Sequence, residues 1–239
     1  MRGRTWGLAA IVVGLAAGMS LSSGGAASIN LTSQAFTPYR TCTITATPVA
    51  TTAVLDTTVR QGSGTTNFGA TDPLTVSSGT ANNHRIYLKF DLATCAPVIP
   101  ASAIVRLATL RLFMTAVPAA CRTLDIFPVG VAWTEGAITW NNQPFGAAIN
   151  NPATASRSGS FDVGTTAGCQ NLASGAYVVG GTVTTDVASF VSSASTNFGW
   201  MIRDDVEGSA PPGTATFAAK ELGTVAQEPQ LVVTYVTVP

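Results

Sequence analysis

The chain has 239 residues, and its 12 basic and 12 acidic side chains make charged residues only 10% of the total. A typical globular domain carries roughly 25% charge, so a broad basic surface for binding nucleic acid is excluded. Hydrophobic residues make up 46%, which is enough for a core, and the length favours one domain. A single histidine and the absence of closely spaced cysteine pairs argue against zinc clusters and histidine-based catalysis.

Residues 1–27 have the pattern of a secretory signal peptide. Arg2 and Arg4 form a basic start, an apolar run of about a dozen residues follows, and small residues lead up to Ala27. We predict cleavage after Ala27, which leaves a chain in which acidic side chains outnumber basic ones by two. An uncleaved anchor is the alternative, but the run is shorter than the roughly 20 residues that span a bilayer. The sequence therefore predicts a secreted, extracellular protein without stable membrane insertion.

Four cysteines remain after this cleavage, which is an even number in an oxidising compartment: Cys42, Cys95, Cys121 and Cys169. Two disulfide bonds are expected, and three connectivities are open. One hypothesis pairs Cys95 with Cys121, because the two residues bracket a predicted strand and their bond would close a short loop. Free buried thiols are the alternative.

Residues 28–41 have few apolar positions, so we expect a loose leader there and a single folded domain over 42–239. In this domain short apolar runs alternate with Gly and Pro, a pattern that predicts an all-β sandwich or barrel. The clearest strand is 85–92, in which alternate residues share a face. Its apolar face, expected to point inward, has Ile86, Leu88, Phe90 and Leu92. Its other face, expected to point outward, has Arg85, Tyr87, Lys89 and Asp91.

The later elements follow the same alternation. Residues 109–115 predict a strand with Arg111 facing outward, and residues 197–204 predict another with Arg203 pointing away from the core. The inward residues of these two strands are Leu110, Leu112, Met114, Phe198, Trp200 and Ile202. Only residues 185–192 have apolar side chains at helical spacing, so at most one or two short helical turns are expected.

Seven blocks of the chain stand in an order and spacing that resemble a known family. They are LDTTVRQGSGTTNFG (55–69), NHRIYLKFDL (83–92), ATLRLFM (108–114), WTEGAITWNNQP (133–144), NFGWMIRDDVEG (197–208), TFAAKE (216–221) and PQLVVTY (229–235). Together they cover nearly all of residues 50–236 and resemble the DNRLRE-type module, also described as carbohydrate-binding module family 96. The resemblance implies a galactose-binding-like jelly-roll β-sandwich on secreted or surface proteins. It also implies binding of acidic polysaccharides of the alginate type.

The candidate ligand-binding residues lie on the outward face of the strand 85–92. Arg85, Tyr87 and Lys89 are expected there at intervals of about 6.6–7 Å, and Arg111 on the next outward-facing strand extends the row. A guanidinium can bind a sugar carboxylate through two hydrogen bonds, and an ammonium adds a compact charge. A tyrosine ring can lie against a sugar face.

Two further cations, Lys220 and Arg203, are weaker additions to this row. The alternative is an ordinary solvated sheet face, whose cations pair with Asp91 or Asp125. Both interpretations stay open from the residues alone.

The aromatic residues and the histidine favour structural roles. Trp133 and Trp140 are flat enough for sugar stacking. The block around them contains Asn141, Asn142 and Pro144, which are typical of a turn, so packing is the favoured interpretation. His84 is expected to be exposed and uninvolved in chemistry. No nucleophile elbow or zinc-binding helix motif occurs in the sequence, and no catalytic residue is predicted.

Asp204, Asp205 and Glu207 gather acidic oxygens as a calcium site does, although their spacing does not fit an EF-hand. A structural calcium ion and a solvated acidic turn are the two interpretations, and no other cofactor is implied. Asp56 and Asn67 offer further oxygens, but the sequence does not bring them together.

The leading hypothesis is a secreted, non-catalytic carbohydrate-binding module for an anionic polysaccharide. The alternative is a structural or adhesive surface protein that keeps the sandwich without a sugar site, which the low charge favours. A lyase or hydrolase is the third hypothesis, and the sequence argues against it.

Overall fold

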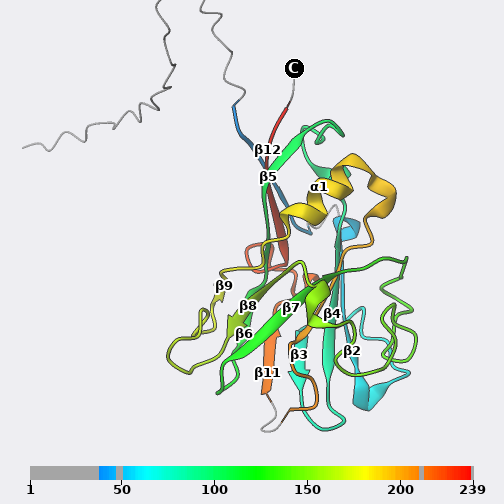
Figure 1. Ribbon diagram of the computed structural model, residues 1–239, viewed down its shortest axis with the longest axis vertical. Helices are drawn as coiled ribbons and strands as arrows, with labels where there is room; N and C mark the ends of the chain where they lie inside the picture. The colour runs from blue at the N-terminus through cyan, green and yellow to red at the C-terminus, as the bar shows by residue number, and fades with distance from the viewer. Residues whose placement is uncertain (1–37, 47–50, 210–212, 238–239) are drawn as a thin grey trace, which may run out of the picture. The chain divides into compact units, whose positions relative to one another are not determined.

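The alternating apolar residues fold the chain into antiparallel strands, which form two sheets in the computed structural model (Figure 1). The structure describes residues 38–46, 51–209 and 213–237. A three-stranded sheet has the order β1 (Arg40–Ile44), β12 (Gln230–Val236) and β5 (Ile104–Arg111). This small sheet packs against a larger one, and the two together confirm the prediction of an all-β sandwich.

The larger sheet has nine strands. Eight of them follow the order β8 (Gly159–Val163), β7 (Arg122–Pro128), β10 (Trp200–Asp204), β4 (His84–Phe90), β3 (Leu74–Ser78), β11 (Gly213–Phe217), β6 (Phe113–Ala116) and β9 (Ala176–Tyr177). The remaining strand, β2 (Val54–Arg60), pairs with β4 in antiparallel register. The strand β4 therefore lies between β2 and β10, in the interior of the sheet.

The α-helix α1 (Thr184–Ser192) confirms the predicted helix, and it buries Val187 and Phe190. The other helical segments are three-residue 3-10 turns. They are η1 (Thr51–Ala53), η2 (Gln61–Ser63), η3 (Leu92–Thr94), η4 (Thr154–Ser156), η5 (Ala194–Thr196) and η6 (Lys220–Leu222). None of the helices in the described ranges is long and apolar enough to cross a membrane.

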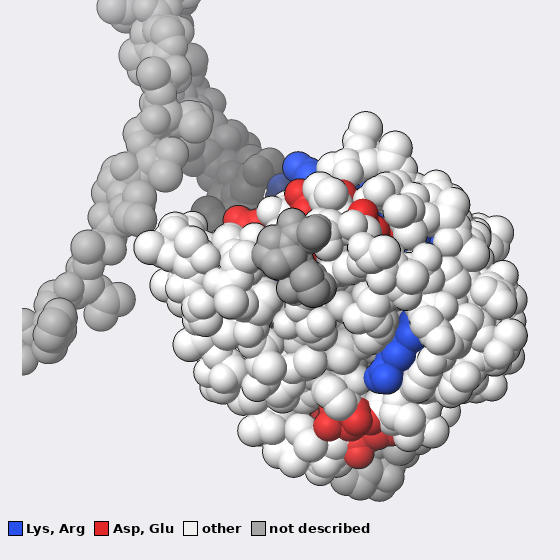
Figure 2. All heavy atoms as spheres, turned by 90° about the horizontal axis from the view of Figure 1, so that it is seen from below, with Lys and Arg blue, Asp and Glu red and all other residues white. Residues whose placement is uncertain are grey.

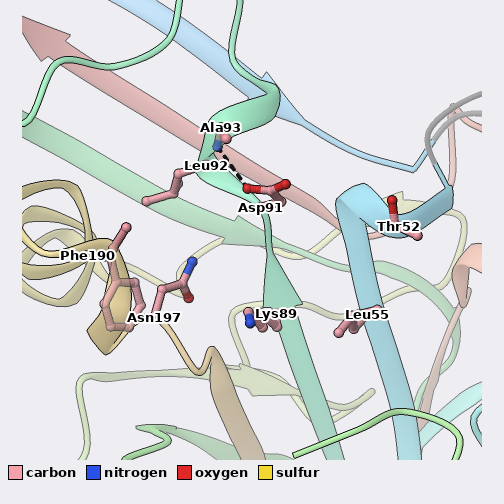
Figure 3. Close-up of a pocket in the computed structure, with 9 residues that line it drawn as sticks. Thr52, Leu55, Lys89, Asp91, Leu92, Ala93, Phe190 and Asn197 are labelled. Carbon is pink, nitrogen blue, oxygen red and sulfur yellow. Dashed lines mark hydrogen bonds between the residues drawn. The ribbon is translucent and has the colours of Figure 1, made fainter. Parts of the chain in front are cut away.

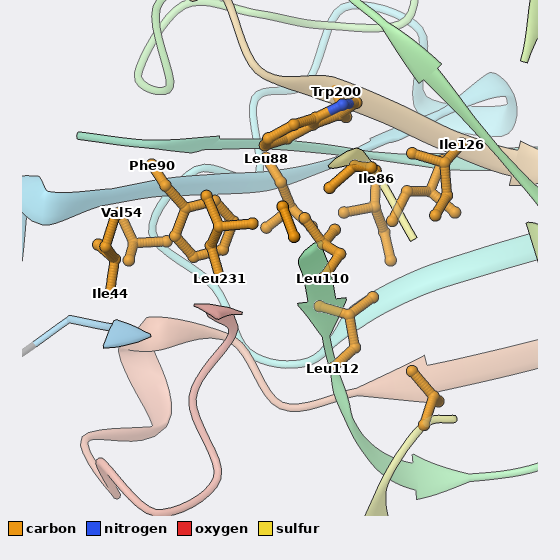
Figure 4. Packing of buried hydrophobic residues seen from close by; sticks show 14 of the residues in the cluster. Ile44, Val54, Ile86, Leu88, Phe90, Leu110, Leu112, Ile126, Trp200 and Leu231 are labelled. Carbon is orange, nitrogen blue, oxygen red and sulfur yellow. The ribbon is translucent and has the colours of Figure 1, made fainter. Parts of the chain in front are cut away.

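The main core lies between the two sheets (Figure 4). The inward face of β4 packs there, as its alternation predicts, and it meets Leu231 of β12 and Leu110 of β5. Trp200 of β10 joins the same cluster and is 1% exposed. Each buried Val, Leu, Ile or Phe side chain contributes about 1.5–3 kcal/mol, so the residues of this cluster stabilise the packing of the two sheets.

A second apolar cluster lies on the opposite face of the larger sheet. Tyr87 of β4 and Met201 of β10 belong to it, together with Ile138 and Trp140 from the strand-free segment 129–150. This segment covers the sheet face that the sequence predicts to be outward. The larger sheet is thus covered on both sides around β4, which explains why five of the seven residues of β4 are buried.

Several sequence predictions need correction. The predicted strand 109–115 is divided between β5 and β6, which lie in different sheets. The predicted leader extends too far, because Arg40 and Thr41 already belong to β1. The predicted signal peptide and most of that leader lie outside the described residues.

Two disulfide bonds form, as expected, but not in the hypothesised connectivity. Cys42 is bonded to Cys95, and Cys121 is bonded to Cys169. The pairing of Cys95 with Cys121 is therefore wrong. The first bond attaches β1 to the end of η3, and the second attaches the start of β7 to the segment that follows β8.

Candidate functional site

Arg85 is on the face of β4 that the segment 129–150 covers, and its side chain is fully buried. Its guanidinium donates two hydrogen bonds of 2.8 Å to the Glu207 carboxylate. It also donates to the backbone oxygens of Gly146 and Ala148. The guanidinium carbon lies 4.5 Å from the centre of the Trp140 ring. The prediction that Arg85 faces solvent is therefore wrong, and its role is to hold the covering segment on the sheet.

Tyr87 is buried beside Arg85, so it too cannot lie on an exposed row. Its hydroxyl donates to Gln143 Oε1 at 3.0 Å, and its ring packs edge-on against Trp133. Burial is the main cause that raises the pKa of Tyr87. Trp140 is 3% exposed, and the half-buried Trp133 packs against the same apolar cluster, so the positions of both agree with the favoured packing role.

Lys89, near the end of β4, is half-buried and lines a pocket to which the segment 129–150 contributes no residue. The pocket has a volume of about 350 Å³. Lys89 and Asp91 line it from β4 and the residue after it, and Leu55 lines it from the neighbouring strand β2 (Figure 3). Among the described residues, Lys89 takes part in no ion pair.

One of the other walls comes from α1 and the loop after it, which are distant in the sequence, and another comes from η3, which follows Asp91 directly. Phe190 of α1 and Asn197 face it from one side, and Leu92 of η3 closes another (Figure 3). The remaining lining residues are Thr52, Ala93 and Ala194. The pocket is therefore lined by apolar residues together with four polar ones, Thr52, Lys89, Asp91 and Asn197, a mixture found in sites that orient a polar ligand.

Local backbone geometry shapes this pocket. Gly199 has φ +74°, and a Cβ atom there would lie 2.0 Å from the backbone oxygen of Leu88, so only glycine lets this loop pass so close to β4. The side chain of Asn197 fixes the same loop by donating to the backbone oxygen of Phe90 at 2.9 Å. Asp91 accepts a 3.0 Å hydrogen bond from the backbone of Ala93, which caps η3. The pocket is therefore built on fixed backbone.

The other predicted cations do not continue a row with Lys89. Arg111 belongs to β5 in the other sheet, where its guanidinium carbon lies 4.4 Å from the Tyr177 ring centre and it donates to Gln230. Arg203 points away from the main core, as predicted, but it is 1% exposed because its guanidinium donates to the backbone oxygens of Asn150 and Pro152. Asp125 pairs with Arg157, at 3.0 Å, and with neither Arg85 nor Lys89.

Lys220 lies in an acidic cluster. Its ammonium contacts the Glu135 carboxylate, and it lies 3.6 Å from Glu221 Oε1 and 4.0 Å from Asp56 Oδ1. Burial, followed by the nearby Glu221 carboxylate, raises the pKa of Asp56 well above its usual value. The charge of Lys220 is thus directed at protein carboxylates.

The acidic turn at 204–207 is largely paired with arginines. Arg122 donates to both carboxylate oxygens of Asp204, and Arg85 holds Glu207. This pairing supports neither interpretation made from the sequence, because two of the three carboxylates already bind cations within the protein and neither is solvated. They help to anchor the buried side of the sheet.

His84 is partly buried, which corrects the prediction that it is exposed. Its Nδ1 lies 2.9 Å from the Thr75 hydroxyl, and its Nε2 lies 3.2 Å from Asn82 Oδ1. Burial, with a smaller contribution from the charge of Arg60, lowers the pKa of His84 to about 4. The imidazole is therefore neutral at pH 7.

Sequence reasoning missed most of the pocket, since Leu55, Phe190 and Asn197 carry no local signal for ligand binding. Leu55 and Asn197 each begin one of the seven sequence blocks, and these blocks were the available indication. On the face shown in Figure 2, charged side chains form a few small patches on a largely uncharged surface. A local pocket is thus a better candidate than an extended charged surface.

A β-sandwich with a pocket of apolar walls and a few polar side chains fits the class of ligand-binding modules. The chain belongs to carbohydrate-binding module family 96, whose model matches residues 47–235. A polysaccharide partner follows from this membership. No curated protein matches the chain. The match confirms the family 96 part of the resemblance, while the DNRLRE name stays a prediction.

Proposed function

We propose that this protein is a secreted, non-catalytic module that binds an acidic polysaccharide in the pocket at the end of β4. The observation that carries the proposal is the position of Lys89, which lines the pocket and takes part in no ion pair with any described carboxylate. A uronate residue would place its carboxylate at Lys89. The two disulfide bonds support an extracellular location.

The rest of the pocket suits the other groups of a sugar ring. Asp91 uses Oδ1 to cap η3, which leaves Oδ2 to accept a hydrogen bond from a sugar hydroxyl. Leu55 and Phe190 offer apolar contacts to the ring carbons. Because Asp91 repels a second anionic group, the pocket favours one carboxylate at a defined position over a dense negative charge.

The test is retention of the purified full-length protein on immobilised alginate, pectate, xylan, chitin and a neutral glucan. We expect retention on alginate or pectate that weakens as the salt concentration rises. Lys89→Ala should weaken this retention about tenfold, because a hydrogen bond to a charged group contributes about 1.5–3 kcal/mol.

Arg106→Ala is the matched control. Arg106 is an exposed cation on β5, so this variant loses the same charge from the other sheet and should bind normally. Equal binding by Lys89→Ala and the unmodified protein would overturn the assignment of the pocket. Preference for the neutral glucan would overturn the acidic specificity, and no retention on any polymer would favour the structural or adhesive alternative.

A further inference from the structure

The acidic cluster around Lys220 joins three segments that are far apart in the sequence. Asp56 comes from β2, Glu135 from the covering segment 129–150, and Glu221 from η6. One carboxylate oxygen of each lies within 4.8 Å of the others. Since calcium–oxygen distances are about 2.3–2.6 Å, oxygens separated by this much can reach a single ion.

The Asp56 carboxylate is buried, and one of its two oxygens has no hydrogen-bond partner. Asp56 is 1% exposed, and its Oδ2 accepts a 2.9 Å hydrogen bond from the backbone of Lys220. Its Oδ1 is buried without any hydrogen-bond partner and faces the cluster, 4.0 Å from the Lys220 ammonium. An unpartnered buried carboxylate oxygen is costly, and a bound cation removes that cost.

The other carboxylates also retain free oxygens. The hydrogen bonds to the Glu135 side chain, from the backbone of Asp56 and from Lys220, both end at Oε1. Asn67 fixes the backbone of Glu135 by donating to its oxygen at 2.6 Å. Asp56 and Asn67, which the sequence alone leaves apart, thus both meet at Glu135.

The charges of the cluster do not balance. Three carboxylates face a single ammonium, so two positive charges are missing when all three are ionised. Oxygen-only ligands select hard cations, and a divalent ion both supplies the missing charge and uses the free oxygens.

We propose that Asp56, Glu135 and Glu221 form a binding site for a hard divalent cation of the calcium type. The ion takes the place of the Lys220 ammonium, which turns outward, because two cations cannot share these oxygens. The bound ion fastens β2, the covering segment and η6 to one another. This proposal is independent of polysaccharide binding, since none of these carboxylates lines the pocket.

The test measures bound calcium directly. The full-length protein is treated with a chelator and dialysed against 1 mM CaCl₂, and bound metal is determined by elemental analysis. We expect one calcium ion per chain and a melting temperature that rises with calcium concentration, by about 5–11 °C at one hundred times the dissociation constant.

Two variants and a control define the site. Glu221→Gln should abolish binding, and it should fold because this side chain is partly exposed. Lys220→Gln should bind calcium more tightly than the unmodified protein, because the competing ammonium is gone. Asp205→Asn changes an acidic residue in the turn 204–207, outside the cluster, and should bind normally. No bound calcium in the unmodified protein, or normal binding by Glu221→Gln, would overturn the proposal.

Discussion

The buried ion pair of Arg85 and Glu207 should contribute far more to the stability of the fold than Lys89 on the same face of β4. The sequence places Arg85 and Lys89 on one solvated strand face, where replacing either should have a similar, small effect. In the structure both side chains of the Arg85–Glu207 pair are 0% exposed. We predict that Arg85→Met strongly destabilises the fold and that Lys89→Met leaves its stability nearly unchanged.

The expected magnitude follows from the contacts of the guanidinium. Replacement by Met keeps much of the side-chain volume but removes two hydrogen bonds to Glu207 and those to Gly146 and Ala148. The Glu207 carboxylate then stays buried with only the backbone N–H of Asn150 as its partner. Breaking a buried ion pair in this way costs about 3–5 kcal/mol. Total stabilities are about 5–15 kcal/mol, so the variant should be only marginally folded.

Urea unfolding followed by tryptophan fluorescence measures this difference. The midpoint for Arg85→Met should fall by about 2 M, and the double variant Arg85→Met with Glu207→Gln should recover part of the loss, because no charge then stays unpaired. A loss below about 1 kcal/mol, or an equal loss in Lys89→Met, would refute the reasoning.

Two further predictions concern the first disulfide bond and the histidine. The Cys42–Cys95 bond spans 53 residues, so Cys42→Ser with Cys95→Ser should lower the free energy of unfolding by about 4 kcal/mol in the chain-entropy treatment; calorimetry that shows no change would contradict it. The folded-state pKa of His84 is lowered to about 4, so the unfolded chain binds the proton more tightly, and stability present above pH 6.5 is lost as the pH falls towards 4. The full shift corresponds to roughly 3 kcal/mol, which solvent screening of the partly exposed ring reduces to about 1–2 kcal/mol. His84→Gln should lose correspondingly less stability over this pH range, and identical pH profiles would rule out the assignment.

Local pattern was sufficient to predict much of the fold. The alternation in 85–92 identified β4 and its core-facing residues, because strand geometry alternates side chains between two faces whatever surrounds them. The helical spacing in 185–192 identified α1 for the same kind of reason. The even number of cysteines predicted two disulfide bonds, although their connectivity depends on which strands become neighbours.

The environment of the second face of β4 was not predictable from that alternation. A period of two separates the faces but does not show what covers them, and Arg85 was assigned to solvent because arginine is mostly exposed in proteins. Its partner Glu207 is 122 residues away in the sequence. A buried guanidinium needs such distant acceptors, so no local signal can indicate it.

The candidate pocket was likewise predicted only in part from the sequence. The sequence identified Lys89 and its chemistry, together with the family whose members bind carbohydrate. Tertiary structure decided that Lys89 lines this pocket while Arg85 and Tyr87 are buried, because the segment 129–150 covers those two residues and contributes no residue to the pocket. It also brought Phe190 and Asn197 beside Lys89, since long-range packing of α1 and its following loop, and no property of those residues themselves, sets their distance from β4.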